Sequence, residues 1–368
     1  MMTSSSILLC LEISIMFSFI KNKSTSLIFF CFYIPGAMAA DVYDKQGNRI
    51  AVNGEIESKL MNSKDKDQDG NEIKVKLGLE LDSQFTNSAS GFAKFEHEIE
   101  LHGAEGDKSN ESKNNLAFAG LKYVTHHIDY GRNYGVIYDV AAYTDGLSLF
   151  DGDFFSDSDI STTKEASNLL TYRQTDFFNL VKGLNFALQY QGKNSHDEVQ
   201  HQNGEGWGAS VSYHFTDNLQ ATLAYFYSNR TQQQQQIRPG KSAEIWAMGF
   251  NYDAEPVKFA GLYSESRNIH FHEVDDNVVI FGKVSTLELL SSYTFASGLE
   301  PGVAYFYSRA NKQVDVVNYF NIFTNYNFND NFKAYAAYKV NLLRNSQRGN
   351  ELEIARDNVI GVGMTYSF

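Results

Sequence analysis

Apolar and polar side chains alternate with a period of two along most of the chain. Near the end of the sequence, Ile360, Val362 and Met364 alternate with small or polar side chains. Side chains of a β-strand point alternately to its two faces, so this pattern predicts strands with one apolar and one polar or small face. The alternation recurs in sixteen segments, at about 49–60, 71–84, 91–103, 113–123, 127–136, 166–176, 182–193, 205–216, 218–229, 241–253, 256–268, 283–295, 300–311, 316–328, 331–344 and 357–368.

Three features favour a membrane barrel over a soluble sandwich. The segments are about 10–13 residues long, whereas soluble strands have about 5–6. Aromatic side chains gather toward segment ends, as at 225–227 and 305–307, and aromatic girdles mark both interfaces of outer-membrane barrels. Short connections such as 216–218 alternate with long polar ones such as 229–241. A sheet that crosses a bilayer must pair every backbone group and therefore closes. We predict an all-β fold: a 16-stranded antiparallel transmembrane β-barrel whose polar inner faces line an aqueous channel.

The stretch 137–165 is the longest without clear alternation, and loops of this length usually have a function. We expect this third loop to fold inward and narrow the channel. Its acidic residues are Asp139, Asp145, Asp151, Asp153, Asp157 and Asp159. Carboxylates can bind calcium, but the spacing is not that of an EF-hand loop, which favours a solvated acidic loop facing the pore.

The first 39 residues differ from the rest of the chain. Lys21 and Lys23 precede an apolar run at 26–34, which is followed by the small-x-small sequence Ala37-Met38-Ala39. This pattern predicts a secretory signal peptide cleaved after Ala39, leaving a barrel domain at 40–368. Residues 1–20 are either a true extension or the product of an upstream start codon. We favour the second, because the signal is complete without them.

Composition and charge exclude several classes of protein. The mean hydropathy of −0.35 argues against a helical membrane protein. The 14% aromatic content with only 4 prolines fits a large antiparallel sheet. The net charge of −13 disfavours nucleic acid as a partner. Both cysteines, Cys10 and Cys31, lie in the leader, so the barrel has neither a disulfide nor a cysteine metal site.

Two local patterns have simple interpretations. His126 and His127 are adjacent in a strand and point to opposite faces, which argues against a metal or catalytic pair. The glutamine run 232–236 is most simply the low-complexity tip of an extracellular loop. We predict no metal site and no cofactor.

Several runs resemble the trimeric general diffusion porins of enteric outer membranes. They are Ala40–Asn48, Leu116–Tyr123, Asp129–Val136, Tyr143–Asp145, Gly183–Asn194, Val317–Phe320 and Tyr366–Phe368. The resemblance covers 40–368 and implies an outer-membrane homotrimer for passive diffusion of small hydrophilic solutes and ions. It also implies contact with lipopolysaccharide at the outer rim. The closing Phe368 is what the family presents to the outer-membrane assembly machinery.

The family opposes acids of the third loop to basic residues of the barrel wall, and this sequence departs from that pattern. Asp145 matches a loop acid, a second loop acid is replaced by Leu149, and Asp151 is a new acid two residues on. On the wall, Glu55 stands in place of a lysine and Asn115 in place of an arginine. Lys76 takes the place of another arginine, and a third arginine position falls at Lys164 or Glu165. Arg132 is retained, and the resemblance ties it to packing and subunit contacts.

The depleted basic wall predicts a channel more cation-selective than the family average, because acidic groups around a pore favour cations. Alternatively, Lys76, Lys164 and other wall lysines restore the balance. Two further functions remain open. A substrate-specific channel would use a track of aromatic side chains along the lumen, but the aromatic residues fall mainly in the lipid-facing register. A barrel enzyme would need a Ser-His or Asp-His constellation near the rim, and no motif places one.

Overall fold

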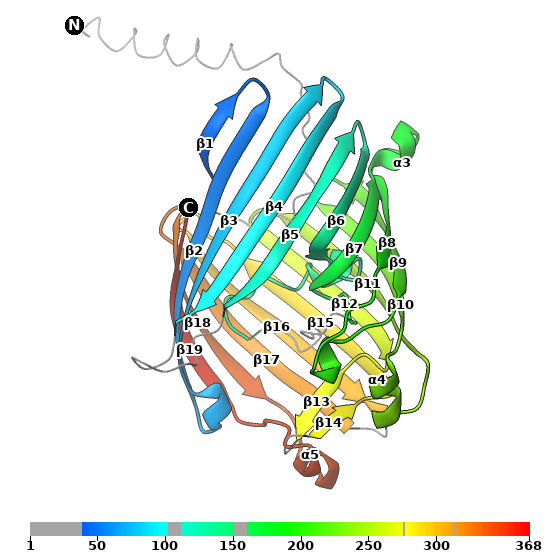
Figure 1. Cartoon of the computed structure of the whole chain (residues 1–368). Helices are drawn as coiled ribbons and strands as arrows, with labels where there is room; N and C mark the ends of the chain where they lie inside the picture. Colours follow the sequence, from blue (N-terminus) through cyan, green and yellow to red (C-terminus); the bar gives the residue numbers. More distant parts are fainter. Residues whose placement is uncertain (1–38, 102–111, 151–159, 275–276, 312–313) are drawn as a thin grey trace, which may run out of the picture. The chain divides into compact units, whose positions relative to one another are not determined.

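The computed structural model describes residues 39–101, 112–150, 160–274, 277–311 and 314–368. Sixteen strands form a closed antiparallel sheet in which each pairs with its neighbours along the chain, and β19 pairs with β2 to complete the ring (Figure 1). The strands are β2 (Asn48–Ser63), β3 (Gly70–Thr86), β4 (Ala89–Glu100), β5 (Ser112–Tyr123), β6 (His126–Tyr134), β7 (Glu165–Gln174), β8 (Leu184–Gln191), β9 (Gly206–Thr216), β10 (Leu219–Asn229), β11 (Ser242–Ala254), β12 (Val257–Arg267), β15 (Val284–Tyr293), β16 (Leu299–Ala310), β17 (Val314–Asn327), β18 (Phe332–Asn341) and β19 (Val359–Ser367). The predicted 16-stranded barrel is therefore confirmed.

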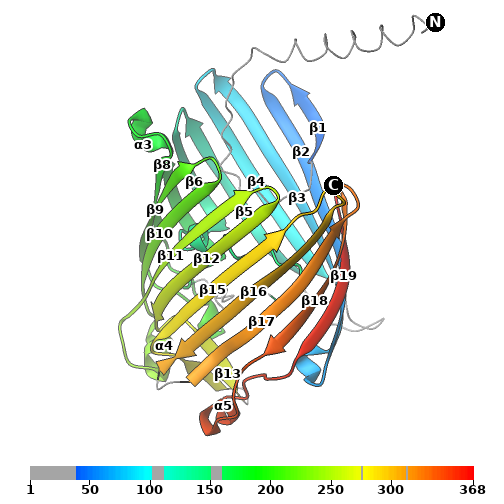
Figure 2. The same ribbon diagram turned by 180° about the vertical axis from the view of Figure 1, so that it is seen from behind.

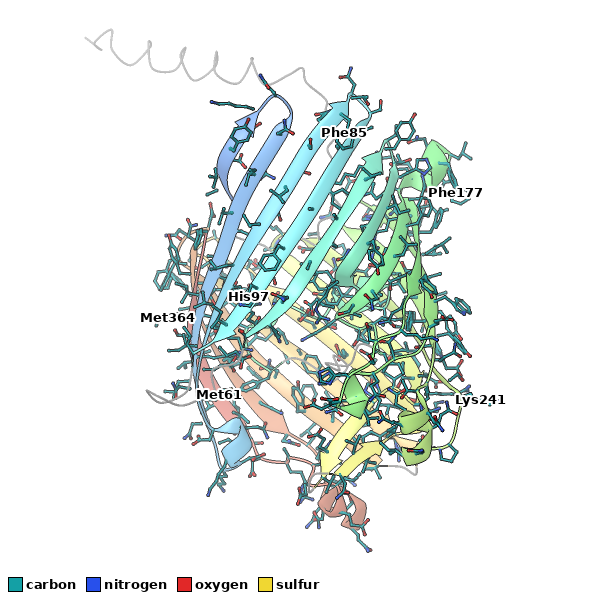
Figure 3. The ribbon with its side chains drawn as sticks, in the orientation of Figure 1. Met61, Phe85, His97, Phe177, Lys241 and Met364 are labelled. Atoms are coloured by element: carbon teal, nitrogen blue, oxygen red, sulfur yellow. The ribbon has the colours of Figure 1, made fainter. Side chains whose placement is uncertain are left out.

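The two ends of the barrel differ, as Figures 1 and 2 show. At the short-turn end, most strands are joined by tight turns, and α3 (Asp176–Asn179) follows β7. At the opposite, long-loop end lie α4 (Gln232–Ile237), α5 (Gln347–Glu351) and the hairpin of β13 (Phe271–Val274) with β14 (Asn277–Ile280). Two 3₁₀ turns, Lys66–Gln68 and Val199–His201, belong to connections at this end. In Figure 3, Phe85 and Phe177 lie toward the short-turn end and Lys241 toward the long-loop end. Among the described residues, no helix combines the length and apolarity needed to cross a membrane.

A short strand not expected from the sequence completes the seam of the barrel. β1 (Ala40–Lys45) folds back on the first residues of β2 through Gln46 and Gly47, both of which have positive φ, as two-residue hairpin turns require. The rest of β2 pairs with β19, and between them Gly54 and Phe368 exchange two backbone hydrogen bonds of 2.9 Å. β1 and β19 therefore follow one another along β2, which is paired over its whole length.

Alternate side chains of each strand point out of the barrel, and most of the outward ones are apolar. In β19, Ile360 and Met364 are exposed, whereas Val359 is buried inside. Outward aromatic side chains form two belts. One, near the short-turn end, includes the contacting pairs Tyr213–Phe215, Tyr293–Phe295 and Tyr326–Phe328, and the other, near the long-loop end, includes Trp207, Tyr225, Tyr227 and Trp246. These belts agree with the predicted girdles.

Two aromatic residues assigned to the girdles from the sequence point inward instead. Phe226 and Phe306 are 0% and 1% exposed and belong to buried clusters inside the barrel. The reason is the period of two: because Tyr225 and Tyr227 face outward, Phe226 between them must face inward. The inner face is therefore not polar throughout, and its apolar part is covered by the loop between β6 and β7.

The glutamine run lies in the long loop between β10 and β11 and forms a helix there. Thr231 caps α4 and forms a capping box with Gln234, whose side chain is fully buried. Gln234 Nε2 donates to the carbonyl oxygens of Val199 (3.0 Å) and Gln202 (2.7 Å) in the preceding long loop. The helix thus joins two long loops at the same end of the barrel.

Candidate functional site

The connection between β6 and β7 lies inside the barrel. Its described parts are 135–150 and 160–164, and it contains the short helix α2 (Tyr138–Ala141). Val136, Ile137, Val140 and Ile160 are fully buried. They pack against inward side chains of β8, β10, β11 and β12, among them Ala187, Ala224, Phe226, Ala247 and Leu262. Burial of this apolar face holds the loop against one side of the inner wall.

Side-chain hydrogen bonds fix the loop at several points along the wall. Asp139 Oδ2 accepts from Arg173 Nη1 of β7 at 2.9 Å and also from the hydroxyl of Ser210 on β9. Thr144 Oγ1 donates to Glu288 Oε2 of β15 at 2.5 Å, and Glu288 is fully buried.

Farther along the loop, the Asn321 side chain on β17 donates from Nδ2 to the Leu149 carbonyl oxygen at 2.9 Å. The loop is therefore attached from β7 round to β17. The opposite wall, formed by β2 to β5, is left facing the lumen.

That opposite wall carries a two-dimensional array of charges, here called the inner-wall network. Its members are Glu55, Glu57, Lys59, Glu72, Lys74, Lys76, Glu96, Glu98, Glu100, Lys113 and Asn115. Directly paired positions alternate in charge: Glu55 lies opposite Lys76, which lies opposite Glu98. The register of the antiparallel strands thus brings residues far apart in sequence into one group.

Three of the predicted site residues meet in this network. Lys76 Nζ lies 3.9 Å from Glu55 Oε1 and 3.7 Å from Glu98 Oε2. Asn115 Nδ2 donates to Glu96 Oε1 at 3.1 Å and to Glu98 Oε2 at 3.2 Å. The Asn115 amide is neutral, so Lys76 and its fellow lysines are the positive charges among these carboxylates.

Glu98 is the central member of the network, and sequence reasoning missed it. It is only 5% exposed and lies within 4 Å of the ammonium groups of Lys74, Lys76 and Lys113. The signal was present in the alternation Glu96, Glu98, Glu100, which places three carboxylates on one face of β4. The cross-strand register needed to pair them with lysines could not be read from the sequence.

Asp145 lies on the loop just after α2. Its Oδ2 accepts a hydrogen bond of 2.7 Å from the Tyr138 hydroxyl, and Tyr138 stacks on Tyr134 with ring centroids 4.3 Å apart. Burial and the neighbouring Asp145 carboxylate raise the pKa of Tyr138 well above its ordinary value, so the phenol stays a neutral donor.

Tyr134 interacts electrostatically with the carboxylates of Glu96, Glu165 and Asp145. Tyr134 therefore interacts with one loop acid and two wall acids.

The remaining predicted site residues lie in different surroundings. Glu165 begins β7, and the Lys164 carbonyl oxygen before it accepts from the Gly135 amide at 2.9 Å, where the loop leaves and rejoins the wall. Leu149 is 4% exposed and packs against the inner wall, not the lumen. Asp151 lies outside the described residues.

Arg132 and Phe368 both make contacts between strands of the barrel. Arg132 Nε donates to the Asn114 carbonyl oxygen (2.8 Å) and Nη1 donates to Ser167 Oγ (3.0 Å), so the side chain links β5 to the β7 strand. Phe368 closes the seam opposite Gly54.

Among the described residues, His126 and His127 belong to no metal-binding group. His126 Nδ1 lies 2.7 Å from the Tyr172 hydroxyl oxygen. In the described part of the chain, no group of three or more His, Cys, Asp or Glu side chains is placed to hold a metal ion.

Comparison with known proteins gives the family of this barrel. The family model described as "Gram-negative porin" matches residues 45–368. The chain belongs to the Gram-negative porin family. Members of this family are outer-membrane channels and not enzymes, which sets the barrel-enzyme hypothesis aside.

Several relatives of this porin share most of its length. The outer membrane porin protein OmpD of Citrobacter koseri is 38% identical over 341 residues, which cover 90% of this chain and 94% of the relative. Outer membrane protein F of Serratia marcescens is 37% identical, with coverages of 90% and 95%. The solved structure of Salmonella typhi OmpF in complex with daunomycin matches with a TM-score of 0.83 and 35% identity, covering 89% of this chain and 100% of that one.

The same barrel fold occurs at much lower identity. An anion-selective porin from Comamonas acidovorans matches with a TM-score of 0.64 and 15% identity, covering 87% of this chain and 100% of that one.

Proposed function

We propose that this porin is a water-filled channel for passive diffusion of small hydrophilic solutes and ions, with a preference for cations. The observation that carries the proposal is the composition of the inner-wall network. Six carboxylates, at Glu55, Glu57, Glu72, Glu96, Glu98 and Glu100, face four ammonium groups, at Lys59, Lys74, Lys76 and Lys113.

The excess carboxylates of the inner-wall network lie on the lumen side of the barrel wall, where their charge acts on an ion in the channel. Strands β2 to β5 face the lumen beside the inward loop, whose own acid Asp145 accepts a hydrogen bond from Tyr138, the partner of Tyr134 in the stacked pair. Each lysine of the network is within 4 Å of at least one carboxylate, so its charge is locally compensated. The remaining carboxylate charge attracts cations and repels anions.

We further propose that the protein works as a homotrimer, with lipopolysaccharide around its outer rim. A signal peptide would be removed after Ala39, and β1 begins at the next residue, Ala40. The assembly machinery would read the terminal Phe368. Closure of single bilayer insertions in three equal steps supports the trimer, and closure in one step contradicts it.

Liposome swelling tests the transport proposal. We expect neutral sugars to enter at rates that fall with size and do not saturate, and cationic solutes to enter faster than anionic ones of equal size. Saturation by one sugar would instead favour a substrate-specific channel. Equal rates for cationic and anionic solutes would agree with passive diffusion through a general porin and would contradict the proposed preference for cations.

A further inference from the structure

The inward loop makes its farthest described contact with the wall at Leu149 and Phe150. The Leu149 side chain is 4% exposed and packs in a cluster with Phe323 and Ala337 of the wall. Directly behind it lies Gly361 on β19, facing into the barrel. A Cβ at Gly361 would lie 2.9 Å from Leu149 Cδ1 and 3.4 Å from Phe150 Cζ. The missing side chain of Gly361 thus forms a notch that the Leu149 side chain fills.

The backbone at the same place is held by the neighbouring strand. Asn321 Nδ2, on a fully buried side chain of β17, donates to the carbonyl oxygens of Leu149 (2.9 Å) and Phe150 (3.4 Å). The Tyr319 hydroxyl also donates to the Phe150 carbonyl oxygen at 3.2 Å. These bonds fix the turn along the wall, whereas the contact of Leu149 with Gly361 fixes how closely the turn approaches it.

We propose that Leu149 is a positioning residue whose fit into the Gly361 notch sets how far the loop projects into the lumen, and therefore the width of the constriction. The proposal rests on the proposed channel function, and it assigns to Leu149 a role in pore size rather than in pore charge. The aliphatic side chain contributes no charge to the lumen, and it is turned toward the wall.

The geometry gives the direction of each change. Carbon atoms in van der Waals contact are about 3.5–4.0 Å apart, so a methyl group at Gly361 would push Leu149 inward by at least about 0.6 Å. The Gly361→Ala substitution should therefore narrow the pore. Leu149→Ala removes the side chain that fills the notch and lets the turn move toward the wall, which should widen the pore. In the double variant, Leu149 and Gly361 are both replaced by alanine, so a smaller loop side chain faces a larger wall side chain. This should restore part of the original spacing between the loop and the wall.

The test is unitary conductance of the parental protein, Gly361→Ala, Leu149→Ala and the double variant in planar bilayers. We expect Gly361→Ala to lower conductance by roughly 1.2- to 1.5-fold, Leu149→Ala to raise it, and the double variant to lie between the single variants. The size cut-off for sugars in liposome swelling should move in the same directions, whereas the reversal potential in a salt gradient should not change. The controls are Ile360→Ala, on the lipid-facing side of β19, and Gly192→Ala, where a Cβ would lie 3.4 Å from Asn168 Cβ and 3.8 Å from the Asn168 carbonyl oxygen.

The outcomes separate this proposal from the channel function itself. Conductance equal to the parental value in both single variants, or a double variant no closer to the parental value than Gly361→Ala, would overturn the positioning role while leaving the porin intact. Folding of each variant is checked by heat-modifiable gel mobility. Leu149→Ala lies in the loop and leaves the strand pairing untouched. If Gly361→Ala assembles poorly, the conductance of Leu149→Ala alone still tests the positioning role. Absence of channels from the folded parental protein would instead contradict the proposed function.

Discussion

At the scale of single residues, the proposed cation preference depends on which charged groups of the inner wall lie beside a group of opposite charge. Lys76 lies between Glu55 and Glu98, and the neutral Asn115 binds Glu96 and Glu98. A basic side chain at position 115 would compensate two carboxylates at once. Glu55 instead adds a further carboxylate beside Lys76. Both residues therefore shift the balance of the wall toward negative charge.

Reversing the charge at Glu55 should weaken the cation preference. Glu55→Lys places a second ammonium group next to Lys76, and we expect the cation-to-anion permeability ratio to fall by roughly 2- to 5-fold, or about 0.4–1 kcal/mol. The measurement is the reversal potential under a KCl gradient. The matched control is Glu255→Lys, which makes the same charge change in the turn between β11 and β12. Equal shifts in both variants would show that net charge, and not this position, is responsible.

At the scale of elements, the strands were predictable and the loops were not. Period-two patterning located all sixteen barrel strands, because each has one face against lipid and the other against the lumen or the loop. The β13–β14 hairpin and α4 were missed, since they are stabilised by contacts between loops distant in sequence. Gln234, read as part of a low-complexity run, is buried because Val199 and Gln202 supply its hydrogen-bond acceptors. The glutamine-rich composition of the run gave no indication of these two hydrogen-bond acceptors.

Truncating Gln234 should loosen α4 and its contact with the preceding long loop. Gln234→Ala leaves the carbonyl groups of Val199 and Gln202 without these partners and removes half of the capping box, at a cost of about 1–3 kcal/mol. Hydrogen exchange at the amides of Gln235 and Arg238, which bond within this helix, should accelerate by roughly 5- to 100-fold. The exposed neighbour Gln236 provides the control, as Gln236→Ala. If both variants exchange at the parental rate, Gln234 does not anchor the loop.

At the scale of the whole molecule, the barrel depends on closure between its first and last strands. The sequence predicted closure on physical grounds, because an open edge cannot face lipid. It did not reveal that β1 and β19 share β2 as a partner, since that arrangement depends on register. Likewise, the sequence identified Glu55, Lys76 and Asn115 as candidate constriction residues, but only the register connects them through Glu98. Alternation along a strand gives the face of a residue and leaves its neighbours across the sheet undetermined.

Removing Phe368 should weaken the seam in the absence of any assembly machinery. The deletion leaves the Gly54 amide and carbonyl without their partners, which costs about 1–3 kcal/mol. We expect a lower unfolding temperature and a lower yield of refolded barrel in detergent micelles. Phe215→Ala, which removes an exposed aromatic side chain at the same end, is the control. Parental behaviour in micelles, with loss of assembly only in cells, would restrict Phe368 to recognition.

The central claim is that an acid-rich wall makes this porin prefer cations, and the reversal potential of the parental protein tests it most directly. The purified protein is inserted into a planar bilayer separating two KCl concentrations. A potential whose sign shows potassium crossing more readily than chloride is the predicted result. A potential near zero, or one favouring chloride, would contradict the role assigned to Glu55, Asn115 and Asp145 while leaving the channel in place.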